Sequence, residues 1–306
     1  HQNEMAELEK VTKQDIIDFA NAKYADNYVV VYKRAGEDKS VIKVTKPAIT
    51  PVSVNREDQS EFLANLLAEE VKDIEPVFLD FKNDIQKSNV GDVVLIYKKN
   101  TENKRFKLNY ILDMGKDHDT KLKLAVDYLK FLGTTDMSPA QKEEEFYKLG
   151  CDLTVNCGAE KVTITLSGLA DNFDESVALF ENILAGAVAD DEALENLKLS
   201  ELKGRNDAKL NKQIILWRAM GSYAKYGDNS SFRNILSEED LNNVTSAELV
   251  DLIHNLTSYE HKIMYYGPEP INKVASDLEK LHANKSGLKV IPSKNEFIEQ
   301  PMNKPM

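Results

Sequence analysis

Two stretches of this sequence follow the same residue pattern, one near each end of the chain. Thr12 and Asp15 open the first copy, and Thr245 and Glu248 open the second. A Thr followed three residues later by an acid predicts a helix start, because the hydroxyl accepts a free N–H and the carboxylate faces the positive end of the helix. The copies lie roughly 230 residues apart, whereas solenoid repeats have periods of about 20–50 residues. The repeat therefore indicates duplicated domains.

An apolar run follows each helix start and predicts a buried strand, at residues 28–32 and again at 263–267. Since the first copy lies at the very start, we expect the chain to begin in the last part of one domain and to be a fragment of a longer protein. The expected boundaries are 1–43 for the C-terminal end of the preceding domain, 44–75 for an interdomain linker, 76–290 for a complete domain and 291–306 for the start of the next linker. Apolar spacing at 59–71 predicts a short amphipathic helix within the first linker.

Strands and helices alternate within the expected complete domain. Ser138 and Pro139 are typical of a helix start, and Gly150 is typical of a helix end. The predicted elements are strands at 92–99, 106–114 and 262–266, a hairpin joining 153–157 to 162–166, helices at 119–132, 138–149, 172–188, 245–256 and 270–282, and a helical tract at 191–226 that breaks near 204–212. Helices interleaved with antiparallel hairpins favour an α+β fold, with one mixed or antiparallel sheet and helices packed on one side.

Composition argues against two classes of partner. The net charge is −12 and no basic cluster is visible, which disfavours nucleic acid, because phosphate binding needs a concentrated basic surface. No apolar stretch approaches the roughly 20 residues that span a bilayer, so we expect no membrane span. A solvated acidic surface is the simplest interpretation of the charge, and cationic or unfolded peptides are the alternative ligands.

The two cysteines, Cys151 and Cys157, lie in one predicted strand. At about 3.3 Å per residue their α-carbons would be roughly 20 Å apart, which is beyond the reach of a disulfide. We therefore expect two free thiols with a structural role.

The ordered series of elements resembles the four-domain bacterial zinc peptidases of the M16 (insulinase/pitrilysin-like) family. The matching pieces are the strand 106–115, the helix ending at Gly133-Thr134, the helix ending at Leu149-Gly150, the hairpin ending at Gly168-Leu169, the Val-Thr-x-x-acid helix that closes each copy, and the linker pieces 51–56 and 74–78. The resemblance covers nearly the whole chain and implies an M16 peptidase-like (LuxS/MPP-like) domain. No single motif carries it.

In that family a helical His-x-x-Glu-His signature binds zinc through its two histidines, and the Glu acts as general base on the bound water. Aligned on Gly133-Thr134, the signature falls on 124–128 of this chain. Leu124 and Tyr128 occupy the two ligand positions, and Asp127 occupies the base position. The resemblance therefore implies no metal site and no catalytic residue in this chain, with zinc expected in the missing N-terminal domain of the parent protein.

Other candidate site residues are weaker. The family uses an Arg and a Tyr from a late helix of the domain opposite the zinc site to hold substrate, and Arg218, Tyr223 and Tyr226 lie in such a helix here. The linker indicates a third domain, so the alternative is a packing helix with an exposed Arg. The histidines form no zinc-spaced set: His118, His254 and His282 are expected at the surface, and His261 precedes a strand.

Three functional hypotheses follow. The first is a non-catalytic part of an M16-type zinc peptidase that helps to enclose unfolded peptides, with the N-terminal catalytic half of the same parent as its partner and the periplasm as the compartment expected from the family. The second is a scaffold or assembly subunit of a non-peptidase relative, which would lack His-x-x-Glu-His in its N-terminal part. The third is an independent metalloenzyme built from scattered histidines and acids.

Overall fold

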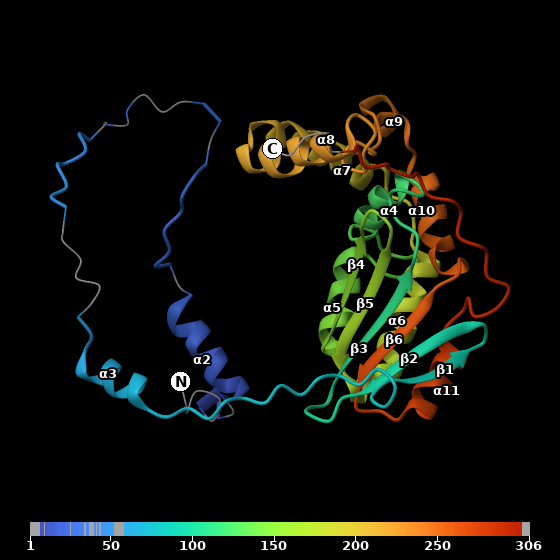
Figure 1. Cartoon of the computed structure of the whole chain (residues 1–306), viewed down its shortest axis with the longest axis horizontal. Helices are drawn as coiled ribbons and strands as arrows, with labels where there is room; N and C mark the ends of the chain where they lie inside the picture. Colours follow the sequence, from blue (N-terminus) through green and yellow to red (C-terminus); the bar gives the residue numbers. More distant parts are fainter. Residues whose placement is uncertain are drawn as a thin grey trace. The chain divides into compact units, whose positions relative to one another are not determined.

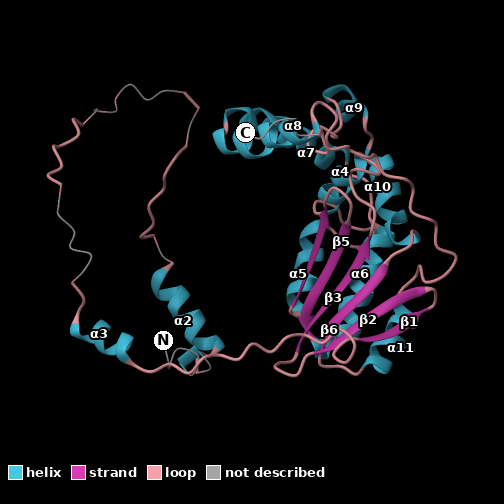
Figure 2. Cartoon of the chain, in the orientation of Figure 1, coloured by secondary structure: helices cyan, strands magenta, loops and turns pink. Residues whose placement is uncertain are grey.

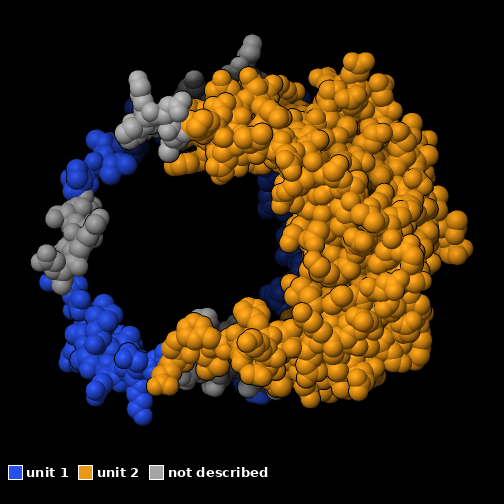
Figure 3. All heavy atoms as spheres, turned by 45° about the vertical axis from the view of Figure 1, so that its right-hand side comes forward, with its two compact units in different colours: residues 1–74 blue, residues 75–306 orange. Residues whose placement is uncertain are grey.

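The computed structural model describes residues 7–8, 10–24, 26–33, 35–36, 40, 42, 44–51 and 58–301. The chain divides into two compact units, residues 1–74 and 75–306, which are coloured separately in Figure 3. Each unit is described by itself below.

Two helices form the regular structure described in the first unit, α2 (Lys13–Lys23) and α3 (Glu61–Ala68). The predicted capping box of α2 is present: Asp15 N–H donates to Thr12 Oγ1, and Thr12 N–H donates to the Asp15 carboxylate. Helix α3 is shorter than the predicted 59–71, because Ser60 caps its start and Glu69 leaves the helical conformation. No residue of either helix is buried.

The buried strand predicted at 28–32 is wrong. These residues form no strand, and Val29 and Val31 are 91% and 89% exposed. Their counterpart in the second copy is β6 (Lys262–Gly267), which lies between two strands that precede it in the chain. The described residues before 28 include no strand with which such a run could pair, and an unpaired strand leaves its backbone hydrogen bonds unmade.

The second unit is built on one six-stranded sheet (Figure 1). Its strands are β1 (Gln86–Val90), β2 (Val93–Lys99), β3 (Arg105–Leu112), β4 (Cys151–Cys157), β5 (Val162–Leu169) and β6. Their order is β1-β2-β6-β3-β5-β4, and every neighbouring pair is antiparallel except β2 and β6, which are parallel. The α+β fold with a mixed sheet is confirmed.

The helices of this unit agree broadly with the pattern in the sequence. They are α4 (Lys121–Leu129), α5 (Pro139–Leu149), α6 (Phe173–Gly186), α7 (Asp191–Leu210), α8 (Gly221–Tyr226), α9 (Glu238–Asn243), α10 (Ser246–Asn255) and α11 (Ile271–Leu281), with a π-helical segment at Ile214–Met220. The predicted break in the long tract falls at Asn211, whose backbone is extended. Helix α9 is an element that the sequence pattern did not predict.

One face of the sheet carries the core. Alternate residues of each strand point toward a layer that includes α6 and α11, and helices lie behind the sheet in Figure 2. Phe106 packs edge-on against Phe173 of α6 with ring centroids 5.0 Å apart, and Tyr97 stacks on Tyr265 at 5.7 Å. The opposite face, which holds residues such as Lys107 and Tyr266, stays partly exposed.

Strand β1 is a further element that the pattern missed. Its sequence, Gln-Lys-Ser-Asn-Val, is polar because it is an edge strand with only one buried side chain. A two-residue turn at Gly91 and Asp92 joins it to β2, and Val90 pairs with Val93 across that turn. Gly91 has φ of +55°, a conformation that glycine adopts without strain. A Gly-Asp pair before a strand is the signal that could have predicted this hairpin.

Candidate functional site

The three positions that the family's zinc signature would occupy lie on α4. Leu124 is 6% exposed and Tyr128 is fully buried, so both belong to the core. The Tyr128 hydroxyl donates to Asp190 O and accepts from Asp190 N–H, both at 2.7 Å. These side chains hold α4 against the start of α7, and they offer no nitrogen or carboxylate to a metal.

Asp127 is the acid that remains at the base position. Its carboxylate accepts hydrogen bonds from Lys123 and, at 2.9 Å, from Lys130, one turn away on either side. Burial would raise the pKa of Asp127, but these hydrogen bonds outweigh it and hold the pKa below its usual value. The group is therefore a carboxylate engaged by two lysines on the helix surface. Among the residues that the structure describes, no three His, Cys, Asp or Glu side chains could hold a metal ion together.

The expectation that His282 lies at the surface is wrong. His282 is 1% exposed, at the end of α11, and its Nε2 lies 3.0 Å from Nε2 of His261, which is 7% exposed. His282 Nδ1 lies 2.7 Å from the Glu181 carboxylate, which also accepts from the Tyr110 hydroxyl at 2.8 Å. The chain of contacts ends at Tyr259 O, 2.7 Å from His261 Nδ1. A polar cluster thus crosses the core, where each member satisfies the next.

No local pattern marks this cluster in the sequence, because its members come from four separate elements. His254 is exposed, as expected, and its Nε2 lies 2.9 Å from Ala187 O. His118 is half-buried, and its Nδ1 accepts from Gly115 N–H. Both cysteines are free and buried, and burial raises the pKa of Cys157 to about 11, which fits the predicted structural role.

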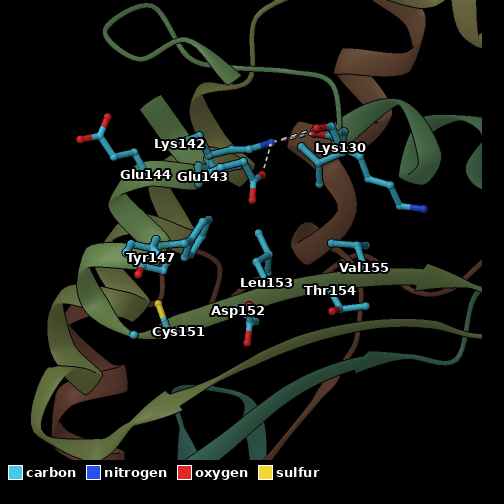
Figure 4. A pocket seen from close by; sticks show the side chains of 14 residues that line it. Lys130, Lys142, Glu143, Glu144, Tyr147, Cys151, Asp152, Leu153, Thr154 and Val155 are labelled. Atoms are coloured by element: carbon cyan, nitrogen blue, oxygen red, sulfur yellow. Dashed lines mark hydrogen bonds and ion pairs between the residues drawn. The ribbon is translucent and has the colours of Figure 1, made fainter. Parts of the chain in front are cut away.

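A hollow of the second unit lies between α5 and β4 (Figure 4). This groove has a volume of about 900 Å³ and is open along part of its length. The C-terminal end of α4, one face of α5 and residues 151–155 of β4 line it. Strand β4 is the last strand of the sheet and pairs only with β5. One row of its backbone N–H and C=O groups therefore has no partner strand in this sheet.

Lys142 fixes the wall of the groove. Its ammonium group is buried and donates to the carbonyl oxygens of Lys130 and Leu132 at 3.2 and 3.1 Å, just after the end of α4 (Figure 4). Burial lowers the pKa of Lys142, and the nearby Glu143 carboxylate, 3.6 Å away, opposes that shift. A lysine at the negative end of a helix satisfies carbonyls that the helix leaves free. Lys142 thus joins α5 to the end of α4 beside the groove.

The accessible lining of the groove mixes one aromatic ring with polar groups. Tyr147 is 86% exposed, and Asp152 and Thr154 stand on the exposed positions of β4. Beneath them, Leu153 and Val155 alternate toward the core side. An unpaired edge with alternating side-chain positions is suited to an extended peptide, since main-chain groups can pair while every second side chain meets the groove.

Arg218, Tyr223 and Tyr226 do not line this groove. Arg218 lies in the π-helical segment with its guanidinium 5.7 Å from the centre of the Phe232 ring. Tyr223 is 61% exposed and lines a separate, mostly apolar hollow of about 460 Å³. The Tyr226 hydroxyl lies 3.5 Å from Glu299. Their role in substrate contact remains a prediction.

The segment after α11 runs along the surface of the second unit. Asn295 N–H donates to Asp117 O and Gln300 N–H donates to Lys225 O, both at 2.8 Å. Residues 292–301 form no helix or strand, and the assignment of 291–306 to a following linker remains a prediction. None of the described helices is both long and apolar enough to cross a membrane.

No protein-family model matches the sequence, and no curated protein is similar to it in sequence. Solved structures are similar in fold. A peptidase M16 inactive domain from Pseudomonas fluorescens aligns with a TM-score of 0.58 and 17% identity, over 70% of this chain and 54% of that one. The periplasmic protease PqqL from Escherichia coli aligns with a TM-score of 0.58 and 12% identity, over 98% of this chain and 31% of that one.

The ferredoxin protease FusC, solved in complex with Arabidopsis ferredoxin, aligns with a TM-score of 0.60 and 11% identity, over 95% of this chain and 30% of that one. At these identities the likeness concerns the fold, and the chain has the fold of M16 peptidase domains. The chain spans about half of the Pseudomonas domain protein and less than a third of the two proteases.

Proposed function

We propose that this chain is a non-catalytic part of an M16-type zinc peptidase, and that its second unit forms a wall of the space that receives unfolded peptides. The fold of M16 inactive domains and of two proteases supports this, as does the loss of both metal-ligand positions at Leu124 and Tyr128. In this proposal the metal and the general base belong to an N-terminal catalytic half of the same parent protein. The chain itself comprises the end of a preceding domain (1–43), an interdomain linker (44–75), a complete inactive domain (76–290) and the start of the next linker (291–306).

The groove between α5 and β4 carries the proposal. An extended peptide would add to the free edge of β4 as a seventh strand, so that main-chain hydrogen bonds supply sequence-tolerant affinity. Tyr147 would cover one face of the bound segment with its ring. Unfolded substrates present such backbones, whereas folded proteins keep theirs paired.

Backbone methylation of the ligand tests strand addition directly. We would measure binding of the whole chain to an unstructured fluorescent peptide of about ten residues, and to two versions N-methylated at alternate residues in opposite registers. A peptide strand turns every second N–H toward its neighbour, so one register should abolish binding and the other should not. Equal binding of both methylated peptides would refute strand addition.

A pair of tyrosine variants locates the contact. Tyr147→Ala should weaken binding of the unmethylated peptide about fivefold, the size expected for one lost aromatic contact. Tyr223→Ala removes an exposed ring outside the groove, at a position predicted to contact substrate, so the pair compares the two places; a peptide held only at the groove would bind Tyr223→Ala unchanged. If Tyr223→Ala weakened binding and Tyr147→Ala did not, the peptide site would lie at the π-helical segment and α8 instead.

A further inference from the structure

The open face of the sheet is basic, although the chain as a whole is acidic, with a net charge of −12. Strand alternation separates this face from the core: Phe106 and Leu108 are buried, whereas Arg105 and Lys107 are exposed. Five cations stand on the open face, namely Lys87, Lys98, Arg105, Lys107 and Lys262, and the strands place one carboxylate there, Asp152. We call these five side chains and the apolar residues between them the basic face.

Only part of this charge is neutralised by neighbours. Lys98 pairs with Asp84 at 3.2 Å, and Lys262 pairs with Asp113 at 2.7 Å. Across the described part of the chain, no carboxylate lies within ion-pair distance of Lys87, Arg105 or Lys107. Several lysines on helices pair along their own helix instead, such as Lys203 with Asp207 and Lys148 with Glu144. The basic face therefore keeps unpaired cations on a rigid scaffold.

Strand register places these cations around an apolar strip. Lys98 and Lys107 both lie opposite Tyr266, one on each neighbouring strand, and Met264 lies opposite Ile96. Tyr266 and Met264 are 40% and 39% exposed. Arg105 and Lys107 are two residues apart on β3, so their α-carbons are about 7 Å apart. Alternate side chains of an extended peptide repeat at the same distance, which lets one bound strand meet both cations.

We propose that the basic face docks an extended acidic peptide segment whose carboxylates stand at alternate positions, on the one side of the segment that meets the cations. This rests on the proposed peptide-binding function and adds the chemical class of the segment. A nucleic acid fits less well, because the strip between the cations is apolar and offers no partner to successive phosphates. The basic face and the edge of β4 would bind different stretches of the same substrate.

Charge reversal on the basic face tests this proposal. The chain would be titrated with an unstructured fluorescent peptide that has Glu at alternate residues and Val or Tyr between them, and with its Gln counterpart. Arg105→Glu combined with Lys107→Glu should weaken binding of the Glu peptide about tenfold at low salt, and salt near 1 M should remove the difference, because the Debye length is then about 3 Å. Lys209→Glu combined with Lys212→Glu makes the same change in net charge on exposed residues outside the sheet and should leave binding unchanged.

Each other outcome overturns the proposal. Equal losses in the two double variants would mean that only net charge matters, and equal binding of the Glu and Gln peptides would remove the carboxylate from recognition. Displacement by a single-stranded oligonucleotide at equal concentration would assign the face to a general polyanion. If the charge-reversal variant does not fold, Arg105→Gln combined with Lys107→Gln removes the two charges without reversing them. This variant should show about half of the change in the logarithm of the affinity expected for charge reversal. The N-methylated peptides test strand addition at β4 and do not depend on the basic face. The proposed function can therefore hold when this proposal fails, and the two failures are distinguished by separate measurements.

Discussion

At the scale of single residues, the partners of the buried histidine pair decide which ring nitrogens carry hydrogens. Tyr259 O accepts only, so His261 Nδ1 carries a hydrogen, and Glu181 Oε1 lies 2.7 Å from His282 Nδ1. The two Nε2 atoms lie 3.0 Å apart, a distance that requires a hydrogen between them. Burial first, and the nearby His282 charge as well, lower the pKa of His261 to about 4. His261 is therefore neutral with its hydrogen on Nδ1, and the hydrogen between the two rings belongs to His282 Nε2.

The pKa of His261 predicts how stability depends on pH. The ring stays neutral in the folded state down to about pH 4, whereas in the unfolded chain it binds a proton below about pH 6.5. The unfolded state thus binds more protons in this window, and the free energy of unfolding should fall by up to about 3 kcal/mol as pH drops from 6.5 to 4. Urea unfolding at several pH values measures this slope. His261→Gln should flatten it, and an unchanged slope in that variant would contradict the assignment.

At the scale of elements, the repeated capping box marks two helices with different support. Thr245 caps α10, whose Leu249 and Ile253 are buried, whereas Thr12 caps α2, which buries no residue. Thr245→Ala should lower the free energy of unfolding of the second unit by about 1 kcal/mol, the usual cost of a lost N-cap. Thr12→Ala removes the same bonds from α2 and should leave the urea midpoint unchanged. Equal shifts in the two variants would mean that α2 unfolds together with the core.

The sequence predicts where helices and strands lie better than it predicts which of them are neighbours in space. Local signals located α5 and α10, because Ser138, Gly150 and Thr245 act on backbone groups within one turn. Both walls of the groove were predicted as a helix at 138–149 and a strand at 153–157, but not that β4 is the edge of the sheet. Strand order depends on β6, which enters between β2 and β3 from far along the chain. The pairing of His282 with His261 is equally non-local.

At the scale of the whole molecule, the two copies of the repeated stretch differ in what precedes them. In the second copy β6 pairs with β2 and β3, and its Ile263 and Tyr265 enter the core. In the first copy, residues 28–32 correspond to β6, and their side chains are exposed. A similar apolar run is therefore a central strand in one copy and an unpaired run in the other, depending on whether strands are present on both sides.

This difference predicts unequal resistance to proteolysis. Helices α2 and α3 bury no residue and residues 28–32 are exposed, so the described part of 1–74 lacks the packing that protects a backbone from cleavage. Brief digestion with a low concentration of chymotrypsin should cleave after Tyr24, Tyr28 or Phe62 and so remove most of residues 1–74. A fragment that contains 86–291 should remain. Mass spectrometry of the digest identifies the cleavage sites, and circular dichroism of the fragment reports its unfolding.

The fragment should keep the unfolding midpoint of the whole chain, since the sheet and its helical layer lie entirely within it. Cleavage at equal rates in both units, or a lower midpoint for the fragment, would mean that the first unit contributes to the stability of the second.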